Sequence, residues 1–167
     1  MEIEKWIQNQ KKYTLRFDGV SKNNHGRAGA GGVIHDQKGE VISSYEWGLG
    51  NMSNNKVEVY NLFLGTCLLI KLQAKDLVVI NNSTIIIAAM ETGGEFKNQA
   101  LNRIKQRILE NTKHMGNIHY KHVLRAHNQE ADYLTNKAVN RRARQVKELQ
   151  NIYEKSIPWI PFHFGWD

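Results

Sequence analysis

Cysteine and proline are scarce in this chain, which contains one cysteine and two prolines among 167 residues. The single cysteine, Cys67, excludes an internal disulfide and the zinc patterns built from paired cysteines. It lies in an apolar run with helical spacing, so we expect a buried packing residue. No apolar run reaches the ~18 residues that a membrane span requires. The first residues lack the apolar core of a secretory signal, and we expect an intracellular chain whose compartment the sequence does not identify.

Acidic residues are also few relative to basic ones. The chain has 16 Asp and Glu against 23 Lys and Arg, a formal net charge of +7. Such a balance favours a polyanionic partner, nucleic acid before a membrane surface, although a merely basic surface would give the same count. The length fits one domain with a substantial core, and we expect a monomer without a membrane partner.

The first part of the chain predicts a β-meander. Residues 1–11 are interpreted as a polar lead-in, and the alternation of apolar and polar residues that follows predicts a strand over roughly 12–19. The glycine-rich segment 23–32 lacks the Gly-Lys-Ser/Thr of a phosphate-binding loop. It leads instead into a turn at 36–39 and a second apolar stretch, so we expect three antiparallel strands.

Helices and parallel strands are expected in the remainder. Ser53 can serve as the N-cap of a helix over residues 54–72, and the apolar run 77–80 is typical of a parallel strand covered on both faces. Further helices are expected over 84–90, 98–112 and about 128–150, and a strand over 118–124. The predicted fold class is α/β, with three layers: a mixed five-stranded sheet, three antiparallel strands then two parallel ones, and helices on both faces.

Four polar residues are expected to converge at one edge of this sheet. Asp18 ends the first strand and Asn82 the fourth, while Glu58 and Asp132 lie in the first turns of helices. Alone, Asp18 is more typical of an Asp-Gly turn, and Glu58 of a favourable charge near a helix N-terminus. Together, converging carboxylates repel one another unless cations lie between them, and hard oxygen ligands favour Mg²⁺ or Mn²⁺ over zinc.

Three short elements carry a family signature. Residues 18–24 read Asp-Gly-Val-Ser-Lys-Asn-Asn and are followed by Gly-Ala-Gly-Gly-Val-Ile at 29–34. Residues 53–58 read Ser-Asn-Asn-Lys-Val-Glu, and residues 125–136 read Arg-Ala-His-Asn-Gln-Glu-Ala-Asp-Tyr-Leu-Thr-Asn. In this order they resemble the ribonuclease H domain, most closely the plant and retroelement type, with its Thr-Asn-Asn-x-x-Glu and Arg-Glu-x-Asn-x-x-Ala-Asp-x-Leu-Ala elements. The resemblance covers about residues 12–140 and implies a ribonuclease H-like fold there, followed by a basic helical extension and aromatic tail at 141–167.

The resemblance implies cleavage of the RNA strand of an RNA–DNA hybrid with two Mg²⁺ ions, for which Mn²⁺ can substitute. Asp18 would bridge the two metals, and Glu58 and Asp132 would complete their ligand shells. His127 would be the loop histidine that moves protons or aids product release, with His122 as a competing candidate. Contacts to the minor groove of the hybrid, where the 2′-hydroxyl identifies RNA, would come from Gly19, Ser21, Lys22, Asn23, Asn24, Asn54 and Asn55.

One position departs from the family pattern. The third carboxylate of the family ends the fourth strand in a Gly-Asp-Ser-like turn, whereas this chain has Asn82 there. An amide keeps one oxygen ligand and loses the charge, so we expect greatly reduced hydrolysis with hybrid binding retained. The asparagine is either an introduced change or a natural loss of catalysis.

Three functions stay open. The first is a ribonuclease H-type endonuclease in weakened form. The second is a non-catalytic nucleic-acid-binding module of the same fold, which recruits partners through its basic extension and aromatic tail; alternatively, the tail folds back on its own domain. The third is a junction resolvase or transposase, against which the Asn-Asn-x-x-Glu element argues.

Overall fold

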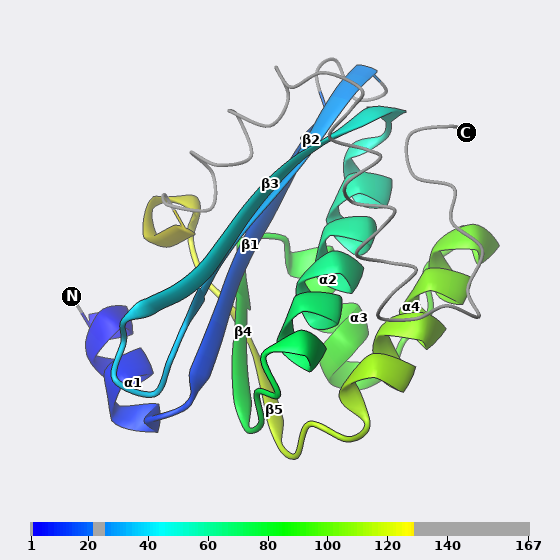
Figure 1. The fold of residues 1–167 in the computed structure, drawn as a ribbon. Helices are drawn as coiled ribbons and strands as arrows, with labels where there is room; N and C mark the ends of the chain where they lie inside the picture. Colours follow the sequence, from blue (N-terminus) through cyan, green and yellow to red (C-terminus); the bar gives the residue numbers. More distant parts are fainter. Residues whose placement is uncertain (1, 22–25, 129–167) are drawn as a thin grey trace.

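The computed structural model describes residues 2–21 and 26–128, which form a sheet with helices on both of its faces (Figure 1). The strands are β1 (Tyr13–Ser21), β2 (Gly26–His35), β3 (Val41–Met52), β4 (Leu77–Asn81) and β5 (Ile118–His122). The helices are α1 (Glu2–Gln10), α2 (Asn54–Lys71), α3 (Thr84–Thr92), α4 (Gln99–Thr112) and the short 3₁₀ helix η2 (Arg125–Asn128).

The strands lie in the order β3-β2-β1-β4-β5. β1 pairs antiparallel with β2, and β2 antiparallel with β3, whereas β1–β4 and β4–β5 are parallel. This is the predicted mixed sheet, and the α/β fold class is confirmed. Because β1 is the central strand, its last residues lie beside the first half of β2, and its middle lies beside the end of β4.

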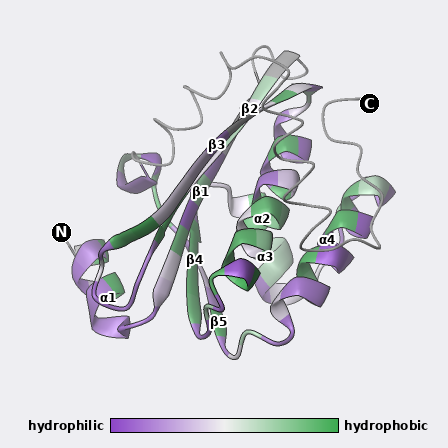
Figure 2. Cartoon of the chain, in the orientation of Figure 1, coloured by the Kyte–Doolittle hydropathy of each residue, from purple (hydrophilic) through white to green (hydrophobic). Residues whose placement is uncertain are grey.

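Helix α2 lies across the sheet and supplies much of the core. Ser53 caps it as predicted, since its side chain accepts a hydrogen bond from the Lys56 amide. Most of its 18 residues are buried, including its polar residues Glu58 and Asn61. It packs in one cluster with α3, α4 and the side chains of β1 and β4 that face them, such as Phe17 and Val79. β4 itself is buried at every position, and all of its residues before Asn81 are hydrophobic (Figure 2).

Helix α1 corrects the interpretation of residues 1–11 as a polar lead-in. Its apolar residues Ile3, Trp6 and Ile7 pack on a second cluster, formed by Val78, Ile80 and Val123. Val78 and Ile80 alternate with Leu77 and Val79 along β4, so α1 covers the opposite face of the sheet from α2. The spacing of apolar residues at 3, 6 and 7 is that of an amphipathic helix, a signal that the many polar neighbours obscured.

Trp6 connects α1 to the edge strand β5. Its ring meets the His119 ring edge-on, with ring centroids 5.1 Å apart, and the Lys121 ammonium lies 5.4 Å from the ring centroid. The helix is therefore held by one aromatic residue that covers apolar strand surface and contacts two polar side chains.

Several element bounds differ from the predicted ones by a few residues, and β3 continues to Met52 past a bulge. The predicted final helix beyond residue 128 and the extension at 141–167 lie outside the described residues. Among the helices that the structure describes, none is both long and apolar enough to cross a membrane.

Candidate active site

Asp18 and Glu58 meet where β1 passes the first turns of α2. Both side chains are almost fully buried, with 5% and 6% of their surface exposed. The amide of Gly19 joins them: it donates to Asp18 Oδ1 at 3.0 Å and to Glu58 Oε1. The structure thus brings together the two acids that the sequence predicted to converge.

The environment of Glu58 opposes its ionisation. Burial raises the pKa of Glu58 well above its ordinary value, and the neighbouring Asp18 carboxylate raises it further. The Gly19 amide and the Asn81 side chain act in the opposite direction. Among the described residues, no donor makes a well-formed hydrogen bond to Oε2 of Glu58, although this atom is buried. A buried oxygen beside a second carboxylate is a position that a cation would satisfy.

Asn81 is a part of this cluster that the sequence interpretation missed. It is the last residue of β4 and is fully buried. Its Nδ2 donates to the Phe17 carbonyl at 2.5 Å, and its Oδ1 accepts from the Ser83 amide at 2.8 Å. The signal was the alternation along β4, because Asn81 lies two residues beyond Val79 and so faces α2.

Asn82 is half-buried, and its carbonyl oxygen lies 3.3 Å from His122 Nε2. The predicted role of its side chain as a metal ligand stays a prediction. His119 and His122 lie on opposite faces of β5, as expected, because His119 contacts Trp6 on the α1 side whereas His122 lies beside the Asn82 carbonyl. The prediction that they form no zinc pair agrees with this placement.

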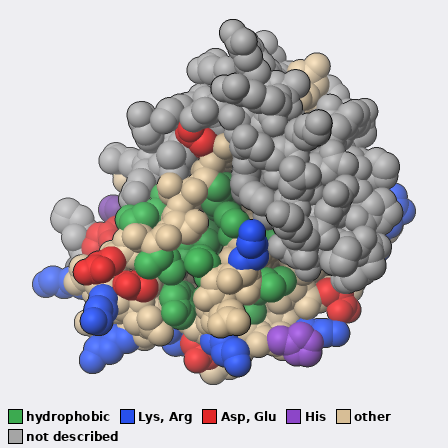
Figure 3. Space-filling model, viewed as in Figure 1, with side chains coloured by type: hydrophobic (Ala, Val, Ile, Leu, Met, Phe, Trp, Pro, Cys, Tyr) green, Lys and Arg blue, Asp and Glu red, His purple; other side chains and the backbone are tan. Residues whose placement is uncertain are grey.

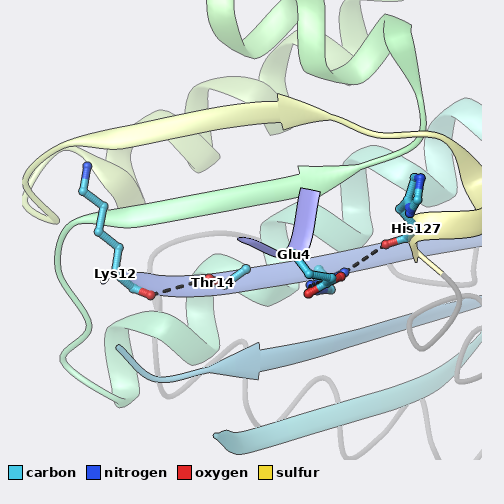
Figure 4. Close-up of polar contacts among 5 residues, drawn as sticks. Glu4, Lys12, Thr14 and His127 are labelled. Carbon is cyan, nitrogen blue, oxygen red and sulfur yellow. Dashed lines mark hydrogen bonds and ion pairs between the residues drawn. The ribbon is translucent and has the colours of Figure 1, made fainter. Parts of the chain in front are cut away.

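The 3₁₀ helix η2 is tied to β1 by two side chains, the first of which, from Arg16, reaches the His127 and Glu4 labelled in Figure 4. Arg16 donates from Nη1 to the His127 carbonyl at 2.9 Å and from Nη2 to both carboxylate oxygens of Glu4, each at 2.8 Å. Asn128, fully buried, donates from Nδ2 to the Phe17 carbonyl at 2.9 Å. Two consecutive residues of β1 therefore hold the segment that leads toward position 132, and Arg16 connects it to α1.

The predicted substrate-contacting residues are described only in part. Gly19 lies in the site, Ser21 pairs with Ala28 at the end of β1, and Asn54 and Asn55 are exposed at the start of α2. The remaining ones, together with one predicted acid, lie outside the described residues: Lys22, Asn23, Asn24 and Asp132. Within the described ranges no group of three His, Cys, Asp or Glu side chains could hold a metal ion. The oxygen donors described at the site are two carboxylates and the amide of Asn81, a set that suits Mg²⁺ or Mn²⁺ better than zinc.

A cavity of about 580 Å³ adjoins Asn55 between α2, α3 and α4. Its lining is largely apolar, with Ile85, Phe96 and Leu101, and includes Lys97. The loop on its far side is held to α4, because the Asn102 side chain accepts from the Phe96 amide at 2.7 Å and donates to the Phe96 carbonyl at 2.8 Å. The wall of the cavity that contains Phe96 is therefore fixed to α4 by two hydrogen bonds. Along the left and lower edges of the face seen in Figure 3, Lys and Arg side chains are interspersed with Asp and Glu.

Cys67 is buried, as expected, and burial raises the pKa of its thiol to about 12. A thiol with this pKa is not ionised at neutral pH and is no nucleophile.

A mixed sheet in this strand order, with an acid on the central strand and a second on the helix after the meander, defines the ribonuclease H-like class of α/β proteins. A family model described as reverse transcriptase-like matches residues 16–138. The chain belongs to this ribonuclease H-like family.

Individual proteins similar to this chain are consistent with its membership of this family. The bifunctional protein Rv2228c of Mycobacterium tuberculosis is 28% identical over 136 residues, which are 81% of this chain and 37% of that protein. The solved N-terminal RNase H domain of rv2228c, a fusion with maltose-binding protein, has a TM-score of 0.74 and 28% identity, covering 77% of this chain and 94% of that one. LC11-RNase H1, solved in complex with an RNA/DNA hybrid, has a TM-score of 0.70 and 28% identity, covering 77% and 97%. The chain spans little more than a third of the length of the curated relatives that it matches.

Proposed function

We propose that this chain is a ribonuclease H-type endonuclease that cleaves the RNA strand of RNA–DNA hybrids with two divalent cations, in a form weakened by Asn82. The observation that carries the proposal is the buried pair Asp18 and Glu58, joined through the Gly19 amide, with Glu58 Oε2 lacking a well-formed hydrogen bond among the described residues. Membership of the family supports hydrolase chemistry, and the hybrid bound to LC11-RNase H1 supports the substrate class.

The cations would be held by Asp18 between them, with Glu58, Asn82 and Asp132 completing the ligand set. When bound, such ions activate a water molecule as nucleophile and stabilise the charge that develops on the attacking and leaving oxygens. The chain's own part is to hold the acids in place. The Gly19 amide fixes Oε1 of Glu58, so Oε2 is the oxygen available to a ligand.

Asp132 is included because of how the chain approaches it. Asn128, four residues earlier, donates to the carbonyl of Phe17, the residue that precedes Asp18. The chain at 128 is thus within one hydrogen bond of the acid-bearing strand. His127 would carry a proton to or from the product, because its main chain is held by Arg16 while its imidazole is only half-buried.

The Asn82 amide lowers the charge of the ligand set. Two divalent cations bring +4, which four carboxylates would balance and which Asp18, Glu58 and Asp132 meet only with −3. The missing charge weakens cation binding and hence hydrolysis. It leaves untouched the contacts to hybrid that we assign to Gly19, residues 21–24, Asn54 and Asn55. The apolar cavity beside Asn55 would receive part of the same substrate.

The second candidate, a non-catalytic binding module, is favoured by Asn82 itself, and one experiment separates the two. The unchanged chain and Asn82→Asp are incubated with a hybrid labelled on its RNA strand, with Mg²⁺ and then with Mn²⁺. We expect slow or undetectable cleavage by the unchanged chain and clear cleavage by Asn82→Asp. The control is Asn82→Asp combined with Glu58→Gln, which should return cleavage to background.

Hybrid affinity completes this test. The unchanged chain and Asn82→Asp should both bind hybrid. Their affinity for hybrid should fall as the salt concentration rises, because phosphate neutralisation releases counterions. If neither form cleaves while both bind hybrid, the binding module is the correct function. If neither form cleaves or binds, both candidates are refuted.

A further inference from the structure

A buried polar pair, Tyr45 and Asn61, lies directly behind the two acids. Asn61 is on α2, one turn after Glu58, and is fully buried. Its Nδ2 donates to the carbonyls of Asp18 and Gly31, the latter at 3.1 Å. These two residues are partners across the β1–β2 pairing, so one amide group binds both strands.

The remaining hydrogen-bonding atom of Asn61 is also used. Its Oδ1 accepts from the Tyr45 hydroxyl at 2.8 Å. Both donors and the acceptor of this side chain are therefore satisfied inside the core, which is the condition under which a buried amide is retained without a large cost. Burial raises the pKa of Tyr45 well above its ordinary value, so the hydroxyl stays protonated and able to donate.

Two glycines make the space that Tyr45 occupies. Gly32 is its partner across β2 and β3, and a Cβ added there would lie 2.3 Å from the tyrosine ring. A Cβ on Gly65 of α2 would lie 3.0 Å from the hydroxyl oxygen. The ring is thus seated between a strand and a helix with no room for a larger neighbour, and its hydroxyl has one position.

The pair acts on the peptide unit between Asp18 and Gly19. The carbonyl of this unit accepts from Asn61, and its amide donates to Glu58 Oε1. A peptide unit is planar, so a fixed carbonyl fixes the direction of the amide. We propose that Asn61 and Tyr45 are positioning residues that set the relative geometry of Asp18 and Glu58 for cation binding. This inference rests on the proposed function, since it takes the two acids as cation ligands.

The chain offers a matched control on the same helix. Thr66 and Asn111 form a second buried pair, with Asn111 Nδ2 donating to the Thr66 hydroxyl oxygen at 2.9 Å. This pair joins α2 to α4 and contacts neither acid. Tyr45→Phe and Thr66→Val each remove one buried hydroxyl that is bonded to an asparagine, and each keeps the shape of the side chain nearly unchanged.

The experiment measures the affinity for Mn²⁺ alone, by calorimetric titration of the full chain, for the unchanged protein, Tyr45→Phe, Thr66→Val and Asn61→Ala. We expect Tyr45→Phe to weaken Mn²⁺ binding about fivefold, the effect of one typical hydrogen bond, and Asn61→Ala to weaken it more. Thr66→Val should bind Mn²⁺ as the unchanged protein does. Equal Mn²⁺ affinity for Tyr45→Phe and Thr66→Val would overturn the inference.

A second readout needs no metal. Hydrogen exchange of the Gly19 amide, measured without divalent cations, should be faster in Tyr45→Phe than in Thr66→Val at matched global stability. If the two exchange alike, the positioning role is refuted whatever the cation result. If the unchanged protein binds no Mn²⁺ while the Gly19 exchange responds as expected, the two-cation function has failed and the positioning of the peptide stands.

Discussion

Glu58→Gln is expected to stabilise the cation-free protein while removing its response to divalent cations. The glutamate places a buried carboxylate beside Asp18 and leaves its Oε2 without a well-formed hydrogen bond among the described residues. A glutamine of the same shape keeps the Oε1 that accepts from Gly19. Its NH₂ group can donate to Asp18 in place of the like-charge contact.

The expected size follows from Glu58 Oε2, which has no well-formed hydrogen bond within residues 2–21 and 26–128. A buried polar atom without a partner costs about 1–3 kcal/mol, and the substitution removes that cost. For a domain of this length one kcal/mol corresponds to about 2–4 °C, so the melting temperature should rise by roughly 2–12 °C.

The raised pKa of Glu58 determines how the stability advantage of Glu58→Gln changes with pH. Burial and Asp18 raise the pKa of Glu58 in the folded state, while an unfolded glutamate has a pKa of about 4.3. Below that value the carboxyl is protonated in both states and carries no ionisation penalty. The penalty grows as pH rises from there and levels off above the raised folded-state pKa. The advantage of Glu58→Gln should therefore be present at pH 7 to 8 and shrink toward pH 4.

The assay is thermal unfolding with a chelator present, at neutral and acidic pH, then repeated with Mn²⁺. Cation binding to the folded state raises the melting temperature by mass action, which should occur in the unchanged chain and not in the variant. Glu110→Gln is the control, because Lys113 lowers the pKa of this surface glutamate and the substitution should give no stabilisation. A less stable Glu58→Gln at neutral pH, or an advantage equal at both pH values, would refute the reasoning.

Three further changes test the surroundings of the site. Gly19→Ala should lower stability by about 1–3 kcal/mol in urea unfolding and weaken Mn²⁺ binding, because its Cβ would lie 2.4 Å from Val57 Cγ1 and 2.8 Å from Glu58 Oε1; unchanged Mn²⁺ affinity would contradict this. Glu4→Gln should lower the free energy of unfolding by about 1 kcal/mol, since Arg16 loses its charged partner. It should also make the η2 amides exchange faster. Unchanged exchange there would show that Arg16 holds the His127 carbonyl without help from Glu4. Trp6→Ala should cost about 3 kcal/mol or somewhat less in urea unfolding, since the ring is only partly buried; a loss near zero would mean that α1 adds no stability.

The fold could be predicted because its signals are local. Alternation over residues 13–18, the cap at Ser53 and the apolar run 77–80 each report one element, and the order of the elements limits the possible sheets. Asp18 and Glu58 could be placed together because Asp18 was expected near the end of its strand and Glu58 in the first turns of its helix, although β1 continues past Asp18 to Ser21. What failed was α1, whose three apolar residues are helically spaced but few, so that only their contacts with Val78 and Ile80 reveal the helix as part of the fold.

The supporting part of the site could not be predicted, because it depends on tertiary distances. Nothing local distinguishes Asn61 from an ordinary polar helix residue until α2 lies against the Asp18–Gly31 pair. The same holds for Arg16, whose partners are 12 and 111 residues away in sequence. Asn81 was overlooked beside Asn82, although its alternation with Val79 places it toward α2.

The consecutive residues 16, 17 and 18 of β1 have a consequence for strand register. Arg16 binds Glu4 and the His127 carbonyl, the Phe17 carbonyl accepts from Asn81 and Asn128, and the Asp18 carbonyl accepts from Asn61. A slip of one residue would turn every β1 side chain to the other face of the sheet and would misplace all of these partners at once. Glycine-rich β2, which has few side chains of its own to resist slippage, thus pairs with a strand whose alignment is fixed from α1, α2, β4 and η2. The register of the β1–β2 pairing is therefore fixed by the same contacts of β1 that surround Asp18.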